Sequence, residues 1–568
     1  MTEPQSLGAM LRQSCREYAD RPAMYMPINQ GMESLSYRGL YERAYTFAKV
    51  LHKYGLKRGD RVVILSENCP EWAMTDWACQ TLGLVVVPIY PTLPADQAQY
   101  IAKDAGAKFA VTGDDSQTKK LQGMAGMKVL HLKGVDSLEA QALRGEGDLT
   151  REQWEQEIDA AKIDDVATFI YTSGTTGEPK GAMLTHGSLM WVGRVVPKVI
   201  SLGKNDVFFS FLPMSHVFER VNGQMMPIAL GATIGYARSL KSLSADMLMV
   251  RPTVVLCVPR FLESVLDRVM DEMRKQPKLN QRIFEQALIQ GGKRFRGEFA
   301  PLFSITDQLV GKKIRAKMGG RMRFFISGGA ALPRHVAEFY GAFKLTVLQG
   351  FGLTETASGV MVNLPQDNKY WTVGKLLPGM ELKIAEDGEI LLRGPAIMKG
   401  YYHMEEATKA AIDPEGWFHT GDIGQMEGEH LRITDRKKDL LVLGNGKNVA
   451  PQPIENKIKS SRYVSEAVVL GDGMEYCVAL IVPNEEHIRS ELKLPKDTHL
   501  SESQEAKKLV MNDIQSINRT LAPYEAVKRI ALLDRPFSID EGELTPSLKV
   551  KRKVVKDRYK AVIDSLRL

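Results

Sequence analysis

Short runs of β-branched and aromatic residues alternate with helical stretches along most of this chain. Six such runs stand out, at residues 61–65, 108–112, 167–171, 253–258, 322–327 and 345–348. One helical pattern covers residues 70–82, with Pro70 in its first turn and Asn68 just ahead as an expected cap. Because strands that alternate with helices usually pair in parallel, this order predicts an α/β fold with layered, largely parallel sheets.

The chain has 568 residues, which is roughly three to five times the usual length of one compact domain. A charged run, DRKKD at residues 435–439, marks a candidate hinge. We expect a large N-terminal domain of several α/β subdomains at 1–434, a hinge at 435–438 and a small α+β C-terminal domain at 439–568. A charge run is equally typical of a solvated surface, so its position alone leaves both interpretations open.

The composition is that of a globular protein, with 44% hydrophobic and 25% charged residues. A net charge of +7 suits anionic ligands or membrane surfaces but is too small to indicate nucleic-acid binding. Five scattered cysteines without a C-x-x-C pair predict neither a zinc site nor a disulfide framework. With no signal-peptide pattern and no window typical of a membrane-spanning helix, a soluble, cytoplasmic protein is expected.

The segment 274–317 is unusually basic, with eleven Lys or Arg residues against three acidic ones. Such a segment can dock on anionic lipid, which would make the protein peripherally membrane-associated. The alternative is a solvated helical insertion with no partner. The sequence favours the second interpretation and does not exclude the first.

The most informative segment is YTSGTTGEPKG at residues 171–181, which directly follows an apolar run. Its glycines let backbone N–H groups approach an anion closely, and its hydroxyls and Lys180 add further donors. It lacks the ending of a Walker loop, because Gly177 is followed by Glu-Pro-Lys-Gly rather than by Lys and Ser or Thr. The segment therefore predicts a loop that holds a polyphosphate, outside the P-loop class.

Further motifs follow this loop in order: LTHGS at 184–188, SGGAAL at 327–332, QGFGLTET at 349–356, TGD at 420–422, DRKKDL at 435–440 and PSLK at 546–549. Together with residues 171–181 they resemble the motifs of the adenylate-forming superfamily, which includes acyl-CoA synthetases, firefly luciferase and peptide-synthetase adenylation domains. Three features resemble its long-chain fatty-acid–CoA ligases, namely LPMSHVFER at 212–220, LGNGKNVAP at 443–451 and the insertion before residues 319–321.

The resemblance implies that ATP activates a fatty acid, expected to be long-chain, to acyl-AMP with release of pyrophosphate, and that CoA then displaces AMP. The first step depends on alignment and charge neutralisation rather than on a side-chain nucleophile. The cofactors and substrates implied are ATP, Mg²⁺, CoA and the fatty acid. The C-terminal domain is implied to be mobile.

The resemblance also assigns site residues by position. Lys549, Glu355, Thr176 and Lys180 are the implied catalytic residues, and Glu355 with Thr176 would hold Mg²⁺. Asp422 would accept the ribose hydroxyls, and Arg436 would assist at the ribose or phosphate. The full implied nucleotide site is Ser173, Gly174, Thr175, Thr176, Gly177, Lys180, Gly328, Gly329, Ala330, Gln349, Gly350, Phe351, Gly352, Thr354, Asp422 and Arg436.

The remaining assignments concern the second half-reaction. Lys438 matches the hinge position whose backbone rotates, and Gly446 lies near the expected path of the thiol. His216 would gate the acyl path, although a structural histidine is nearly as good an interpretation. Lys549 is preceded by Leu548 where the family often has glycine, which puts the local loop geometry in doubt.

Two other functions stay open. An adenylating enzyme could stop at acyl-AMP or load a carrier protein instead of CoA. A non-catalytic nucleotide- or lipid-binding relative could use the same scaffold, although the presence of Lys180, Glu355, Asp422, Arg436 and Lys549 together argues against it. Acyl-chain length, oligomeric state, regulation and pathway have no signal in the sequence.

Overall fold

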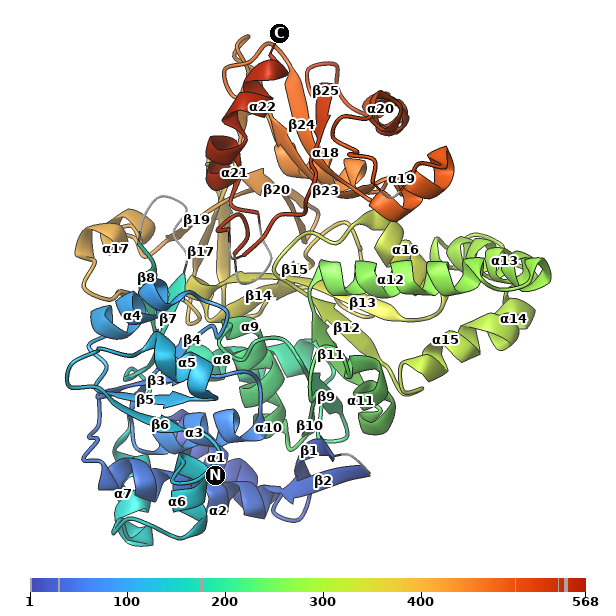
Figure 1. The fold of residues 1–568 in the computed structure, drawn as a ribbon. Coiled ribbons are helices and arrows are strands. Elements are labelled where there is room, and N and C mark those ends of the chain that lie inside the picture. Colours follow the sequence, from blue (N-terminus) through green and yellow to red (C-terminus); the bar gives the residue numbers. More distant parts are fainter. Residues whose placement is uncertain are drawn as a thin grey trace. The chain divides into compact units, whose positions relative to one another are not determined.

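The architecture is mixed α/β with layered sheets and a separate C-terminal unit, as the sequence predicts. The computed structural model describes residues 3–28, 31–172, 178–495, 497–539, 541–545 and 550–567. One unit comprises Met1–Leu382 and Leu392–Phe418, and the other Lys383–Leu391 and His419–Leu568 (Figure 1).

A seven-stranded sheet in the first unit has the order β18-β8-β7-β4-β3-β5-β6. Strands β7, β4, β3, β5 and β6 are parallel, and β8 and β18 add antiparallel at one edge. Helices α3, α4 and α5 make the crossovers. The bounds are β3 (Arg61–Leu65), α3 (Pro70–Thr81), β4 (Val85–Ile89), α4 (Ala95–Asp104), β5 (Phe109–Thr112), α5 (Asp115–Lys120), β6 (Lys128–His131), β7 (Val166–Thr172), β8 (Lys180–Thr185) and β18 (Gly400–Tyr401).

A nine-stranded sheet in the same unit has the order β15-β14-β13-β12-β11-β9-β10-β1-β2. The strands from β13 to β1 are parallel, and the outer strands at both edges are antiparallel. The bounds are β1 (Pro22–Ile28), β2 (Gly31–Ser36), β9 (Val207–Ser210), β10 (Thr233–Tyr236), β11 (Val254–Cys257), β12 (Phe324–Ser327), β13 (Thr346–Leu353), β14 (Ser358–Val362) and β15 (Lys375–Leu376).

Helices cover both sheets of the first unit. Helix α8 (His186–Ile200) contacts β8 of one sheet and β14 of the other, so it lies between them. Helix α3 is buried on every side, which is why it lacks a polar face. On the nine-stranded sheet, Phe325, Tyr340 and Phe343 are part of one buried cluster. Other helices are α1 (Leu7–Glu17), α2 (Tyr37–Lys53), α6 (Leu138–Leu143), α7 (Arg151–Ala160), α10 (Met226–Leu230), α11 (Leu243–Val250), α12 (Pro259–Arg274), α13 (Lys278–Phe295), α16 (Arg334–Ala342) and α17 (Glu405–Ala411).

The second unit contains a four-stranded sheet, β16-β17-β19-β20, and a three-stranded sheet, β23-β24-β25. Every residue of β24 is buried, because alternate side chains enter two different apolar clusters on the two faces of the sheet. The bounds are β16 (Glu381–Ile384), β17 (Glu389–Arg393), β19 (Phe418–Glu427), β20 (His430–Arg436), α18 (Pro451–Ile458), β23 (Val464–Leu470), β24 (Cys477–Pro483), α19 (Glu485–Leu492), α20 (Gln504–Asn518), β25 (Val527–Leu532), α21 (Arg552–Arg558) and α22 (Lys560–Ser565).

Several local predictions are confirmed and one is wrong. All six predicted apolar runs form strands, and all five cysteines are free thiols. Within the described part of the chain, no helix combines the length and apolarity needed to cross a bilayer. Asn68 does not cap α3, whose N-cap is Cys69 without a side-chain hydrogen bond. Instead the Asn68 side chain donates to the carbonyl of Leu212 and accepts from the N–H of Met214, because a distant loop offers it both partners.

Candidate active site

Lys180, Tyr401 and Glu355 meet in the first unit although they are far apart in the sequence. β18 pairs with β8 so that Tyr401 lies opposite Ala182, and the Lys180 Nζ is 5.2 Å from the centre of the Tyr401 ring. The Tyr401 hydroxyl donates a hydrogen bond of 2.8 Å to Glu355 Oε1. Burial, and next the neighbouring Glu355 carboxylate, raise the pKa of Tyr401, so the phenol stays protonated as a donor.

The predicted phosphate loop joins β7 to β8, and the predicted ligands Ser173, Gly174, Thr175, Thr176 and Gly177 lie outside the described residues. Thr172 at the end of β7 and Lys180 at the start of β8 are paired across the two strands. A Cβ on Gly181 would lie 3.0 Å from the Tyr171 ring, which leaves little room for any side chain there. The loop therefore leaves the carboxyl end of β7, the usual position of ligand sites in open α/β sheets.

Glu355 lies in a tight turn, η3 (Thr354–Thr356), between β13 and β14. The Thr356 hydroxyl donates to the carbonyl of Ser358 at 2.8 Å. Two successive non-glycine residues have positive φ, Ala357 at 52° and Ser358 at 111°, an arrangement that costs energy and is found where a site constrains the backbone. Asn222 Nδ2 donates to Ser358 Oγ at 2.5 Å and links this turn to the segment after the 212–220 motif.

The turn after β12 carries Gly328, with Gly329 and Ala330 next in the chain. A Cβ on Gly328 would lie 3.3 Å from the Phe218 ring, so this turn packs against the 212–220 motif. Both polar atoms of the buried Gln349 amide form hydrogen bonds within the protein. Its Oε1 accepts from the N–H of Leu332 at 2.9 Å, and its Nε2 donates to the carbonyl of Tyr370. Gln349 thus holds the turn in place.

Glycines in β13 allow β14 to approach closely. A Cβ on Gly352 would lie only 1.7 Å from the carbonyl oxygen of Ser358, and one on Gly350 would lie 3.1 Å from that of Met361. Phe351, between the two glycines, is buried. Thr354 follows Leu353, the last residue of β13, and opens the turn that carries Glu355. The two glycines therefore determine where that turn begins.

The 212–220 motif ends in α9 (Val217–Glu219) and a π-helical turn, η1 (Arg220–Met225). His216 is the N-cap of α9, and its Nδ1 accepts from the N–H of Phe218 at 3.1 Å. Its ring lies 6.4 Å from that of Tyr90. The capping role is structural, and the gating role stays a prediction.

Two buried ionisable side chains, Arg220 and Glu219, anchor this motif. Arg220 is 1% exposed and forms a bidentate ion pair with Asp76, with N–O distances of 2.6 and 2.8 Å, while its Nη1 donates to Thr168 Oγ1 at 2.6 Å. Glu219 is equally buried, and burial raises its pKa to about 8. Gln224 Nε2 donates to Glu219 Oε1 at 3.2 Å.

In the second unit, Asp422 on β19 lies opposite Arg436 on β20. The Arg436 Nε donates to Asp422 Oδ1 at 2.9 Å, so the two predicted ribose-side residues are brought together. Gly421 has a φ of 68° and donates its N–H to Glu389 Oε1 at 2.9 Å. Burial raises the pKa of the neighbouring Asp435 to about 6.

The remaining predicted residues lie after β20. Lys438 is in the turn that follows this strand. Gly446 lies between β21 (Leu441–Val442) and β22 (Asn448–Val449), has a φ of 77°, and has no described atom within 4 Å of an added Cβ. Lys549, with the rest of its PSLK motif, lies outside the described residues.

The donor set near Lys180 suits one kind of metal ion. Among the described residues, no three His, Cys, Asp or Glu side chains form a cluster that could hold an ion by themselves. Mg²⁺ does not need such a cluster, because it is commonly bound by one or two carboxylates together with substrate phosphates. Glu355 can supply one such carboxylate, and Lys180 can supply charge to the same phosphates.

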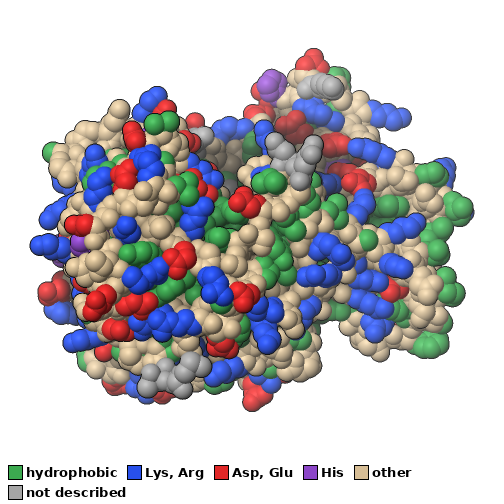
Figure 2. Space-filling model, turned by 90° about the horizontal axis from the view of Figure 1, so that it is seen from below, with side chains coloured by type: hydrophobic (Ala, Val, Ile, Leu, Met, Phe, Trp, Pro, Cys, Tyr) green, Lys and Arg blue, Asp and Glu red, His purple; other side chains and the backbone are tan. Residues whose placement is uncertain are grey.

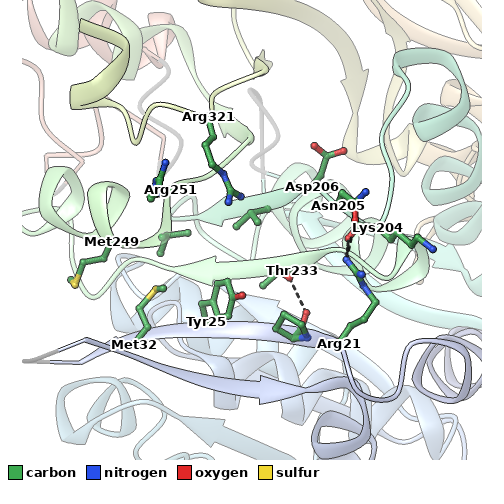
Figure 3. Close-up of a pocket in the computed structure, with 13 residues that line it drawn as sticks. Arg21, Tyr25, Met32, Lys204, Asn205, Asp206, Thr233, Met249, Arg251 and Arg321 are labelled. Carbon is green, nitrogen blue, oxygen red and sulfur yellow. Dashed lines mark hydrogen bonds between the residues drawn. The ribbon is translucent and has the colours of Figure 1, made fainter. Parts of the chain in front are cut away.

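A cavity of about 300 Å³ lies elsewhere in the first unit (Figure 3). Val207 and Thr233, the first residues of β9 and β10, line it together with Arg21, Arg251 and Arg321. It is therefore at the amino ends of the strands. The predicted site residues follow the carboxyl ends, so this cavity is not part of the candidate site.

Three contributors to the site were not found by sequence reasoning. Tyr401 binds Glu355, Asp76 neutralises Arg220, and Asn222 supports the turn after Glu355. The pair of aromatic residues at 401–402 was the only local signal for Tyr401. The sequence around Asp76 and Asn222 gives no signal for their contacts with Arg220 and Ser358, since each pair is more than a hundred residues apart.

Comparisons with known proteins identify the family of this chain. The chain matches the family model described as AMP-binding enzyme over residues 11–402, and that described as AMP-binding enzyme C-terminal domain over residues 438–567. The fold and site thus define an adenylate-forming protein, and the chain belongs to the AMP-binding enzyme family.

Individual relatives make the resemblance more specific. The chain is 34% identical over 544 residues to the long-chain-fatty-acid–CoA ligase FadD15 of Mycobacterium bovis, covering 90% of this chain and 88% of that protein. It is 33% identical over 586 residues to long-chain-fatty-acid–CoA ligase 6 of Mus musculus, covering 95% and 83%. Among solved structures, the adenylation domain of a carboxylate reductase from Mycobacterium chelonae is similar, with a TM-score of 0.79, 23% identity and coverage of 100% and 92%.

Proposed function

We propose that this protein activates a fatty acid, of long chain, to acyl-AMP at the expense of ATP and then transfers the acyl group to CoA. The observation that carries the proposal is the convergence of Lys180, the first residue of β8, with Tyr401 and Glu355. Curated relatives named as long-chain-fatty-acid–CoA ligases, about a third identical over most of the chain, support the choice of substrate and acceptor.

The first step joins a carboxylate oxygen of the acid to the α-phosphorus of ATP. The bond from that phosphorus to the oxygen that bridges it to the β-phosphorus breaks, and this oxygen leaves as part of pyrophosphate. The product is a mixed anhydride in which AMP is a good leaving group. Lys180 and the loop residues Ser173, Gly174, Thr175, Thr176 and Gly177 would hold the β,γ-phosphates. Glu355, oriented by the Tyr401 hydroxyl, would hold Mg²⁺ together with Thr176, and the ion would neutralise phosphate charge.

Asp422 would accept hydrogen bonds from the ribose hydroxyls, and the charge-assisted hydrogen bond from Arg436 would orient that carboxylate. The adenine would lie against the backbone of the turn that contains Gly328, Gly329 and Ala330 and against β13. No side-chain nucleophile is required, because the substrate carboxylate itself attacks. In the second step the thiolate of CoA attacks the acyl carbon and AMP leaves.

The two steps would use different faces of a C-terminal domain at 439–568 that rotates about the hinge at 435–438. Lys438 would absorb the backbone rotation. Lys549 would bridge the substrate carboxylate and the α-phosphate in the first step, and Gly446 would line the thiol path in the second. We include this division of labour in the proposal.

The primary test is acid-dependent exchange of labelled pyrophosphate into ATP, followed by measurement of AMP and CoA thioester over a panel of acids from acetate to oleate. Exchange together with thioester formation, strongest with long chains, supports the proposal. Exchange with acyl-AMP but no thioester in the presence of CoA would assign an acyl-AMP ligase or a carrier-protein-loading enzyme. If no acid supported exchange, the result would favour the alternative of a non-catalytic nucleotide- or lipid-binding protein.

Two variants test the division of labour. Lys549→Ala should abolish acyl-AMP formation and spare thiolysis of supplied acyl-AMP, whereas Lys553→Ala, in the same basic tail, should leave both steps intact. Gly446→Trp should block only the thiol step. Gly446→Asn is the matched control, because asparagine tolerates a positive φ without the bulk of tryptophan. Equal loss of both steps in Lys549→Ala would contradict the division.

A further inference from the structure

One part of the first unit exposes an unusual number of large apolar side chains. Phe299 is 85% exposed, Leu279 68% and Ile305 59%, values expected of charged rather than apolar residues. We call this surface the α13–α15 face. Its apolar members are Leu279, Ile289, Phe299, Leu302, Ile305 and Leu309.

The spacing of these residues shows that they share a face of each helical arm. The exposed residues Leu279, Arg282 and Ile289 on α13 and Arg296 at its C-cap recur at intervals of three or seven, so they form one stripe along the helix. The opposite side of α13 buries Phe284 in the core that also contains residues of α16. The exposed stripe is therefore not required for packing within the first unit.

The second arm repeats this pattern. It consists of α14 (Phe303–Thr306), a π-helical turn η2 (Asp307–Gly311) and α15 (Lys312–Lys317). Leu302, Ile305 and Leu309 are exposed, and the exposed Lys312 and Lys313 follow at the next turn. Both arms thus expose apolar together with basic side chains, and Phe299 lies between the arms in the sequence.

The charge of this face is strongly positive. Residues 274–317 carry eleven Lys or Arg against three acidic residues, and two of those acids are already paired, Glu298 with Arg296 and Asp307 with Arg315. In Figure 2 the right-hand edge, where α13 to α15 lie in Figure 1, shows green apolar and blue basic side chains together.

We propose that the α13–α15 face docks this protein on an anionic lipid bilayer. The apolar side chains would enter the boundary between headgroups and acyl chains, and the basic side chains would bind lipid phosphates, as interfacial amphipathic segments do. Charge complementarity favours this occupant over a second copy of the chain, since two copies of the same positive face repel each other. The inference concerns a surface outside the candidate site and does not rest on the proposed function.

The test is sedimentation of the full-length protein with phosphatidylcholine vesicles and with vesicles that contain phosphatidylglycerol, at low and high salt. Wild type should bind the anionic vesicles at low salt and bind the neutral ones at least tenfold less. Phe299→Ser with Leu302→Ser should lower binding at least tenfold by removing insertion. Lys312→Glu with Lys313→Glu should do so by removing attraction.

Matched controls use exposed residues elsewhere in the first unit. Leu240→Ser, at a position 76% exposed, and Lys103→Glu with Lys119→Glu, on α4 and α5, should bind anionic vesicles as wild type does. Circular dichroism and the thermal midpoint should match wild type in every variant, so that loss of binding is not loss of folding. Equal binding by the face variants and wild type, or salt-independent binding to neutral vesicles, would overturn the proposal. The proposal would also be overturned if wild type bound no vesicles but self-associated, and if the face variants lost that self-association.

Discussion

Replacing Glu219 by glutamine should change how the stability of the first unit depends on pH. Glu219 is 1% exposed, and burial raises its pKa to about 8 from the ordinary value of 4.5. Between these two pH values the unfolded chain releases this proton and the native protein retains it. The stability that Glu219 contributes is therefore fully present below pH 4.5 and is lost as the pH rises through 8.

The size of the effect follows from the shift. Each pH unit in this window is worth about 1.4 kcal/mol, so from pH 5 to pH 8 the native protein loses about 4 kcal/mol through this one group. Glu219→Gln cannot ionise and keeps an acceptor for Gln224. Relative to wild type, the variant should therefore gain about 4 kcal/mol of unfolding free energy over this range.

The assay is guanidinium unfolding followed by tryptophan fluorescence at pH 5, 6.5 and 8. All six tryptophans lie in the first unit, which also contains Glu219, so the signal reports on the relevant unit. Glu285→Gln, at an exposed position on α13, is the control and should follow wild type at each pH. A difference between Glu219→Gln and wild type that stays constant from pH 5 to pH 8 would refute the reasoning.

Three further substitutions test the site and its support. Tyr401→Phe removes a hydrogen bond to the carboxylate of Glu355, a loss of about 1.5–3 kcal/mol, so pyrophosphate exchange should fall roughly 10- to 100-fold. Gly352→Ala places a Cβ where a β14 carbonyl oxygen lies 1.7 Å away, so exchange should fall at least about tenfold as the Glu355 turn shifts. Asp76→Ala leaves Arg220 buried and unpaired, which should lower the unfolding free energy by about 3–5 kcal/mol.

Each of these substitutions has a control at a comparable position. Tyr402→Phe, next to Tyr401, and Gly203→Ala, where an added Cβ has no described atom within 4 Å, should retain exchange activity. Asp20→Ala removes an exposed ion pair, which is worth little. Retained exchange in Tyr401→Phe or Gly352→Ala, or an effect of Asp76→Ala no larger than that of Asp20→Ala, would show that the corresponding contact matters less than its geometry indicates.

The secondary structure could be predicted because its signals are local. An apolar run such as residues 61–65 is long enough for a buried strand and too short for a helix, and it forms β3 as predicted. The loop at 171–181 could be recognised because closely spaced glycines and hydroxyls are themselves the donors that a phosphate needs. The predicted ribose-side residues Asp422 and Arg436 are paired across adjacent strands for a related reason, since both motifs fall within one hairpin.

The sequence by itself thus determined the order of strands and helices, the chemistry of each motif and the family. Only the tertiary structure decided which distant residues meet. Tyr401 contacts Glu355 because β18 pairs with the edge strand β8. The Asn68 side chain does not cap α3, because it forms hydrogen bonds with the backbone of Leu212 and Met214 instead. The physical reason is the same in each case: a side chain binds the best partner that packing brings near, and packing joins segments whose separation along the chain carries no local signal.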